Sequence, residues 1–330
     1  MTGRLTARFD STAVWKNLRM SPRSEIITHN GRLYHLGIAP TDVTGAVFLV
    51  GDPARAYRVA ERFESIECKV TNREYVTLTG VHKGVPMTVV GTGIGTDNVE
   101  IALIELDAAL GIDLETGKRT SHGPMPDIIR IGTSGGVHPD VPAGTLCIAE
   151  YALGLDSTGP YYESPAADDV VRQIETEARR LLDEASGAAA RFGGHLPVYA
   201  SKADPLVTAL LTRHAVASGM RSATGITVSA PGFFGPSSRY VEGLVNTVPD
   251  IKGTLARLSV DNRRVLNMEM ESSLLFHLAG ALGHRAGTIC PAISESSSAA
   301  TPIDYDACVE AAIDIALAAM VDLRALNPSA

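Results

Sequence analysis

The chain has 330 residues, of which 45% are hydrophobic and 20% charged, a balance typical of a globular protein with a large core. The formal net charge of −8 argues against a general nucleic-acid-binding or membrane-binding surface. No apolar run approaches the roughly 20 residues of a membrane helix, and no signal-peptide core precedes the first predicted strand. The four cysteines lie far apart, without a metal-binding spacing. We therefore expect a soluble cytoplasmic protein with free thiols.

Short apolar runs alternate with longer amphipathic ones, which predicts an α/β fold. In chain order we expect a strand at 46–51, a helix from 52, a hairpin turning at Lys83–Gly84, and a helix capped by Asp97. Further strands are expected within 127–136 and 144–152, and helices at 170–186 and 205–218. The segment 266–283 predicts a strand that passes into a helix, followed by a strand at 285–294 and a helix at 306–326. The polar segment 111–127 predicts a surface insertion, and with no linker or repeat we expect one domain, 31–330, after an N-terminal extension, 1–30.

Three predicted strands run directly into glycine-rich turns: "LVGDPAR", "VVGTGIGTDN" and "IRIGTSGG". Ligands of open α/β sheets bind where strands end, and glycines let backbone amides approach an oxyanion closely. The second turn has Thr96 where the dinucleotide-binding fingerprint requires its third glycine, and no turn matches the ATP-binding GxxxxGK[ST] pattern. The turns thus favour a small anion over NAD or ATP.

Arginines accompany two of these turns. Arg55 follows the first, and Arg130 lies in the apolar strand before the third. A buried arginine must meet an anion or a carboxylate, because an unpaired charge is costly to bury. Either a structural salt bridge or a bound oxyanion satisfies this requirement; two arginines together with Thr133 suit a tetrahedral phosphate.

The segment "NMEMES" places two carboxylates, Glu269 and Glu271, on either side of Met270 at a strand-to-helix junction. Alternate residues of an extended segment point the same way, so the two could hold paired hydroxyls of one sugar. Taken in isolation, the segment is explained more simply as a solvated helix N-terminus, where acidic charge is favourable.

Together these segments resemble the nucleoside phosphorylase I superfamily, most closely its uridine phosphorylase branch. The resemblance is carried, in family order, by "YHLG", "VGDPAR", "NREY", "GTGIGTDNVEIALIEL", "IRIGTSGG", "FFGPSSRY" and "NMEMES". It implies a single-domain α/β/α sandwich with a central mixed, partly barrel-like sheet. It also implies phosphorolysis: phosphate attacks the anomeric carbon of a nucleoside, which the uridine phosphorylase branch implies is uridine or deoxyuridine, and releases free base and (deoxy)ribose 1-phosphate. Inorganic phosphate is then the co-substrate, with no cofactor.

The resemblance also implies roles for particular residues. The implied phosphate-binding residues are Gly51, Arg55, Arg130 and Thr133, with Arg73 supplied by a neighbouring subunit. The implied ribose-binding residues are Glu269, Met270 and Glu271, with His35 reaching across from the neighbour. Phe233 would stack on the base and Arg239 would donate to a pyrimidine carbonyl. Sites shared in this way imply a homo-oligomer, and the insertion and N-terminal extension favour a dimer over a hexamer. Glu74 matches a position where some relatives hold an interface ion, but no residue cluster predicts a catalytic metal.

Two positions depart from the uridine phosphorylase pattern. Ser237 stands where that branch usually has a glutamine that contacts uracil, and Glu295 follows the last strand where the branch usually has "NR". Glu295 could act as a general acid, as an acid in the purine branch does, or it could face solvent. The alternatives to a uridine phosphorylase are therefore a purine nucleoside phosphorylase, a nucleosidase, which the retained arginines disfavour, and a non-catalytic nucleoside-binding protein.

Overall fold

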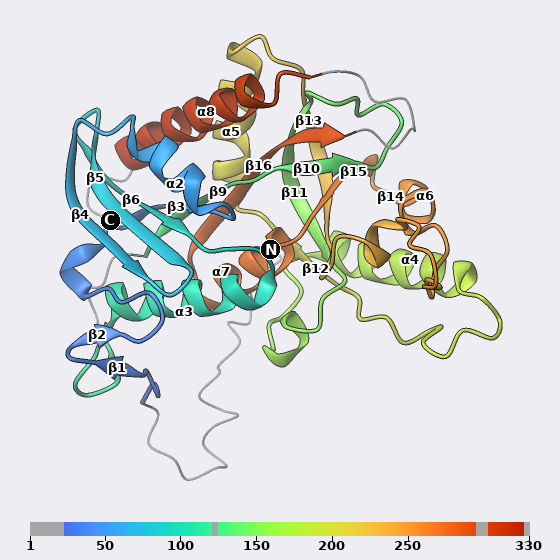
Figure 1. The fold of residues 1–330 in the computed structure, drawn as a ribbon, viewed down its shortest axis with the longest axis horizontal. Coiled ribbons are helices and arrows are strands. Elements are labelled where there is room, and N and C mark those ends of the chain that lie inside the picture. Colours follow the sequence, from blue (N-terminus) through green and yellow to red (C-terminus); the bar gives the residue numbers. More distant parts are fainter. Residues whose placement is uncertain (1–22, 121–124, 295–302, 327–330) are drawn as a thin grey trace, which may run out of the picture.

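The protein is organised around one large mixed sheet of 12 strands, shown by a computed structural model that describes residues 23–120, 125–294 and 303–326 (Figure 1). The order along the sheet is β12-β11-β13-β15-β10-β16-β9-β3-β6-β5-β4, and β14 pairs with β15. The strands are β3 (Ala46–Val50), β4 (Ser65–Asn72), β5 (Tyr75–His82), β6 (Val85–Gly91), β9 (Asp127–Ile131), β10 (Ser134–Gly136), β11 (Leu146–Gly154), β12 (Tyr199–Lys202), β13 (Ser222–Ser229), β14 (Ser259–Val260), β15 (Arg263–Glu269) and β16 (Arg285–Ser294).

Part of this sheet closes on itself. Strand β11 pairs with β13 on one side, and it also forms an antiparallel pairing with β16. The pairings β11–β13, β13–β15, β15–β10, β10–β16 and β16–β11 therefore complete a ring of strands. This ring confirms the partly barrel-like sheet expected from the resemblance.

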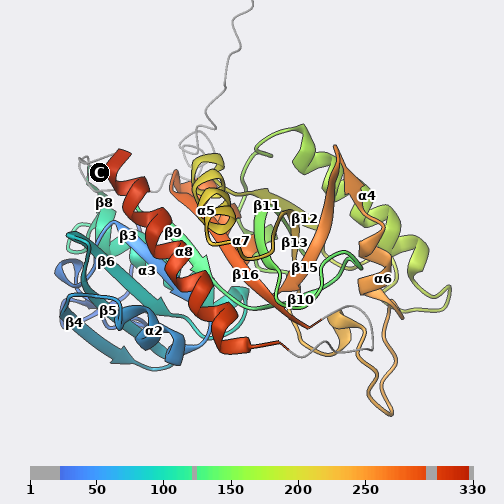
Figure 2. The same ribbon diagram turned by 90° about the horizontal axis from the view of Figure 1, so that it is seen from above.

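The helices form layers on the two faces of the sheet. In the described residues they are α2 (Pro53–Ala60), α3 (Thr96–Gly111), α4 (Asp169–Ala185), α5 (Pro205–Ala217), α6 (Ile251–Ala256), α7 (Ser272–Leu282) and α8 (Tyr305–Leu326). Alternate residues of β3 separate the layers: Phe48 packs with α2, α5 and α8, whereas Val47 and Leu49 pack with α3 and α7. Helices α4 and α6 lie together at the end of the molecule opposite β4 and β5 (Figure 2). The predicted α/β/α arrangement is confirmed.

Four neighbouring strands, β6, β3, β9 and β16, are parallel. Their carboxyl ends therefore meet at one edge of the sheet, as do the turns that follow them. The glycine-rich turns after β6, β3 and β9 are the three singled out in the sequence. This shared edge brings residues far apart in the chain to one site.

The structure corrects one predicted cap and adds elements. Gly95, at φ +99°, precedes α3, while Asp97 lies in its first turn and accepts a hydrogen bond from the Thr158 hydroxyl at 2.7 Å. The segment predicted as an insertion contains a hairpin of β7 (Ile112–Asp113) and β8 (Lys118–Arg119), and a second hairpin pairs β1 (Thr28–His29) with β2 (Arg32–Leu33). All four cysteines are free. Within the described ranges, no helix has both the length and the apolar character needed to cross a membrane.

Candidate active site

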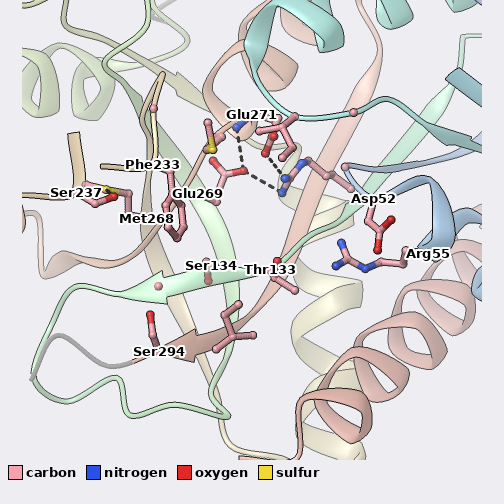
Figure 3. A pocket seen from close by; sticks show the side chains of 18 of the residues that line it. Asp52, Arg55, Thr133, Ser134, Phe233, Ser237, Met268, Glu269, Glu271 and Ser294 are labelled. Carbon is pink, nitrogen blue, oxygen red and sulfur yellow. Dashed lines mark hydrogen bonds and ion pairs between the residues drawn. The ribbon is translucent and has the colours of Figure 1, made fainter. Parts of the chain in front are cut away.

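A cavity of about 800 Å³ opens at the edge where the parallel strands end. It collects most of the residues that the sequence singled out. Figure 3 shows Arg55 and Asp52 at one end of the cavity, Ser237 and Met268 at the other, and Glu269 between them. Its lining includes Gly51, Arg55, Arg130, Thr133, Phe233, Ser237, Arg239, Glu269, Met270 and Glu271.

The Arg55 end of the cavity is built by the turn between β3 and α2. The carboxylate of Asp52 caps α2 by accepting the Ala54 N–H at 2.9 Å, which fixes the start of the helix. Arg55 follows in the first turn and is only 5% exposed; its guanidinium donates to the Ile131 carbonyl at 3.1 Å and the Tyr305 hydroxyl at 3.3 Å. Both partners are neutral, and within the described ranges Arg55 forms no ion pair. This end of the cavity therefore holds a buried positive charge suited to an anion.

Arg130 is held in a different way. From the end of β9 its guanidinium forms one ion pair with Glu269, at 2.9 Å, and another with Glu271. It also donates to the Cys290 thiol at 3.2 Å, where burial raises the pKa of Cys290 to about 12 and keeps the thiol neutral. The sequence left open whether Arg130 meets a carboxylate or a bound oxyanion. In this structure its partners are the two carboxylates.

The two glutamates point to the same guanidinium, as their alternate spacing predicts. They are not a solvated helix end, because Glu269 is 5% and Glu271 is 3% exposed. Glu269 accepts hydrogen bonds from the Ser229 hydroxyl and the Ser272 N–H, and Glu271 accepts the Gly95 N–H at 2.8 Å. These bonds fix both carboxylates at the centre of the cavity.

Burial raises the pKa of Glu271. The attraction of Arg130 opposes this shift, whereas the nearby negative charge of Glu269 adds to it. One guanidinium thus serves two carboxylates, and Glu271 takes up a proton more readily than an exposed glutamate does.

The far end of the cavity is formed by the turn after β13. The guanidinium of Arg239 lies over the ring of Phe233, 3.8 Å from its centroid, and donates to the Phe233 carbonyl at 2.6 Å. Phe234 packs edge-to-face on the same ring at 5.4 Å. The Ser237 hydroxyl lies 3.6 Å from the Met268 sulfur. Phe233 and Arg239 therefore form one stacked wall, and Ser237 presents a short side chain beside it.

Two predicted site residues lie outside this cavity. His35 bonds through Nδ1 to the Glu105 carboxylate at 2.7 Å, and Arg73 donates to the Tyr34 hydroxyl at 2.8 Å and covers the Tyr34 ring. Arg73 and Tyr34 line a separate hollow of about 630 Å³. Neither His35 nor Arg73 completes the cavity of its own chain, which is the arrangement expected if they serve a neighbouring subunit.

The remaining predictions concern Glu74 and Glu295. Glu74 is exposed, and in the portions of the chain that the structure describes there is no group of three or more histidine, cysteine or acidic residues that could hold a metal. Glu295 lies outside the described residues. The prediction for each stays a prediction.

The lining residues that were missed from the sequence include Lys252 on α6, Ser294 at the end of β16, and Tyr305 at the start of α8. Ser294 could have been found, because it ends a strand whose carboxyl end meets the same edge as the predicted turns. Lys252 and Tyr305 carried no such signal, since their positions depend on how α6 and α8 pack.

Comparison with known proteins gives the family. The model of the phosphorylase superfamily matches residues 46–321. The chain belongs to this superfamily. A uridine phosphorylase from Thermococcus kodakarensis is 32% identical over 266 residues, which are 80% of this chain and 77% of the relative. One from Haemophilus influenzae is 29% identical over 263 residues, 79% of this chain and 85% of the relative.

A solved structure extends the phosphorylase comparison to three dimensions. A nucleoside phosphorylase from Trypanosoma brucei, described as showing uridine phosphorylase activity, has a TM-score of 0.78 and 30% sequence identity. The match covers 90% of this chain and 99% of that one. Membership of the superfamily therefore holds for sequence and for fold, and this chain, like its relatives, is a phosphorylase-type enzyme.

Proposed function

We propose that this phosphorylase cleaves a nucleoside, uridine or deoxyuridine, with inorganic phosphate, giving the free base and (deoxy)ribose 1-phosphate in nucleoside salvage. The observation that carries the proposal is the order of groups along one cavity: a buried arginine that forms no ion pair with a described residue, then a carboxylate pair, then an aromatic wall. The arginine suits phosphate, the carboxylate pair suits ribose and the aromatic wall suits the base, which is the order in which the three are connected during the reaction.

The Arg55 end is proposed to bind phosphate. The Gly51 and Thr133 turns supply backbone amides and a hydroxyl, and Arg55 supplies a planar donor without a competing carboxylate among the described residues. Arg130 would then bridge phosphate and the carboxylate pair, because its guanidinium already contacts Glu269 and Glu271. Holding the nucleophile beside the sugar converts an encounter of two substrates into a positioned attack.

The carboxylate pair is proposed to hold the ribose. Ribose hydroxyls donate to carboxylates, and Glu271 and the adjacent Met270 line the centre of the cavity. Cleavage of the glycosidic bond builds positive charge on the ribose, which the bound phosphate and the two carboxylates stabilise. The leaving base takes up negative charge, so donors at the Phe233–Arg239 wall strengthen as the bond breaks.

The assembly is proposed to be a homodimer in which His35 and Arg73 of each protomer complete the other protomer's cavity. Their position outside their own cavity supports this arrangement. We further propose that residues 31–330 form the catalytic domain after an extension at 1–30, that the enzyme acts in the cytoplasm without a cofactor, and that it binds neither nucleic acid nor membrane.

The test is a substrate panel with and without phosphate. Uridine and deoxyuridine should release uracil, followed by ultraviolet absorbance, whereas inosine and guanosine should react far more slowly. Cleavage of purine nucleosides alone would contradict the choice of base and would assign the site to the purine phosphorylase alternative, in which Glu295 acts as the acid. Binding of nucleoside without any product would leave only a binding function.

A further inference from the structure

Lys252 is held at the base end of the cavity by its helix. Helix α6 begins at the cap Asp250, whose carboxylate accepts the Gly253 N–H at 2.8 Å, and Ile251 and Leu255 anchor it in the core against α4. The Ile251 N–H donates to the Ser238 hydroxyl, which ties α6 to the turn that carries Phe233 and Arg239. The position of Lys252 relative to the aromatic wall is thus fixed by packing.

The ammonium group of Lys252 lies beside β10 and the end of β16. A Cβ atom at Gly135 would lie 3.4 Å from Nζ of Lys252 and 3.0 Å from the Ser294 hydroxyl oxygen, so the absence of a side chain at Gly135 leaves both groups room. All three residues line the cavity. Ser294 lies away from Arg55 in Figure 3, so the ammonium group belongs to the base end rather than to the phosphate end.

Lys252 has no hydrogen bond or ion pair with any described residue. Burial lowers the pKa of Lys252, and the positive charge of Arg239 lowers it further. The guanidinium of Arg239 is already engaged with the ring and carbonyl of Phe233. A hydrogen-bond acceptor that enters the cavity would therefore stabilise this half-buried ammonium, which has no partner among the described residues.

The base of a pyrimidine nucleoside supplies such an acceptor. When the glycosidic bond breaks, uracil leaves with a negative charge spread over its ring nitrogen and carbonyl oxygens. A donor aimed at one of these oxygens becomes stronger as the bond breaks, and that is the condition for catalysis rather than mere binding. The Ser237 hydroxyl, directed at the Met268 sulfur, does not provide the contact of a longer amide side chain.

We propose that Lys252 donates a hydrogen bond to a carbonyl oxygen of the leaving base and thereby selects bases, such as uracil, that leave as carbonyl-stabilised anions. Lys252 remains protonated throughout; it lends a hydrogen bond and transfers no proton. Lys252 thus provides the hydrogen bond to the base that the short side chain of Ser237 cannot reach. This inference rests on the phosphorolysis proposed above and extends it to the choice of base.

The test replaces the charge and keeps the stem of the side chain, with Lys252→Met, and compares uridine with 5-fluorouridine, whose base is more acidic. The variant should lose about 100-fold in kcat/KM for uridine, the order expected for one donor to a developing anion. The loss should be smaller for 5-fluorouridine, because a more stable leaving anion needs less help. Lys118→Met, at an exposed lysine of β8, is the matched control and should leave both values unchanged.

Equal losses for both substrates would indicate a structural role and overturn the proposal, as would a Lys252→Met enzyme within about twofold of wild type. Absence of base release by the wild-type enzyme would instead overturn the proposed function. A crystal structure of the wild-type protein with uracil and phosphate tests the contact independently of whether the variant folds. It should show Nζ of Lys252 within hydrogen-bond distance of a carbonyl oxygen, and a separation beyond about 4 Å would overturn the inference.

Discussion

Arg55 is the residue whose surroundings demand a ligand most clearly. Its guanidinium is buried and, among the described residues, has only neutral partners, so an anion should stabilise the folded protein by binding there. Arg55→Met should abolish the rise in melting temperature that phosphate produces in the wild-type protein, and kcat/KM for phosphate should fall by about 100-fold or more.

The control lies on the same helix. Arg58 faces outward and pairs with Asp306 and Glu310, so Arg58→Met should keep the response to phosphate. A thermal shift with phosphate that persists in Arg55→Met would contradict the assignment of this end of the cavity.

The raised pKa of Glu271 should determine how kcat/KM falls at low pH. Burial raises the pKa of this carboxyl, with repulsion from Glu269 adding to the shift and Arg130 opposing it. The ionised form is the one that accepts ribose hydroxyls, so kcat/KM should fall as the pH drops through a value above that of an exposed glutamate. Because the folded-state pKa is raised, the folded state also binds this proton more tightly than the unfolded state, and this contribution to stability is lost as the pH rises through the shifted pKa.

The measurement is kcat/KM for uridine as a function of pH in the wild type and in Glu271→Gln. The variant should be slower by about 100-fold at neutral pH and should lack the acid limb. Glu184→Gln, at an exposed glutamate of α4, should keep the limb unchanged. An acid limb that survives in Glu271→Gln would contradict this assignment.

At the scale of elements, α8 is held against α2 by a network of ion pairs. Glu310 on α8 accepts from both Arg58 and Arg62 on the α2 side. Partial burial acts to raise the pKa of Glu310, but the hydrogen bonds from the two arginines outweigh it and lower the pKa. The network thus stabilises the protein above the usual glutamate pKa, and the contribution is lost as the pH falls through the lowered value.

Glu310→Gln should therefore lower the free energy of unfolding by about 1 kcal/mol at neutral pH, measured by urea denaturation. The difference from wild type should shrink on acidification below the lowered pKa. Glu61→Gln, whose carboxylate lies 3.9 Å from Arg62, should have little effect. A penalty for Glu310→Gln that does not change with pH would show that the ionised carboxylate is not its source.

The elements that the sequence predicted are those with strong local signals. Strand β3 is a continuous buried apolar run, and the β5–β6 hairpin contains a lysine–glycine turn with both residues at positive φ. Strand β4 is largely exposed and carries only a short alternation of Ile66, Cys68 and Val70, and β12 is only four residues long. Helix α6 is short as well, which is why the position of Lys252 emerged only from the packed structure.

In the site, too, some features could be predicted from the sequence and others could not. Gly51, Arg55 and Thr133 were predictable because turns after parallel strands meet at one edge. The partners of Arg130 were not, because a guanidinium beside a glycine turn serves a phosphate or a carboxylate equally well in sequence. The stacking of Arg239 on Phe233 depends on the path of the turn, which no spacing rule specifies.

At the scale of the whole molecule, the proposed dimer predicts complementation between two defective enzymes. In a mixed dimer of Arg55→Met and Arg73→Ala, the cavity of the Arg73→Ala protomer keeps its own Arg55 and receives Arg73 from the other protomer, so one site is intact. Random reassociation should restore about a quarter of wild-type activity, since half of the dimers are mixed and each has one intact site of two.

The two variants are unfolded, mixed and refolded, with each variant refolded alone as the control. Light scattering should give the mass of a dimer. Activity of the mixture no higher than that of the separate variants would contradict sharing of the site between protomers.

Phosphate is the proposed nucleophile, and the product of the reaction tests this directly. The purified enzyme is incubated with uridine and inorganic phosphate and followed by ³¹P nuclear magnetic resonance. We predict a ribose 1-phosphate signal that grows in step with free uracil, and no uracil release when phosphate is omitted. Uracil release at the same rate without phosphate, with ribose as the product, would make the enzyme a hydrolase and contradict phosphorolysis.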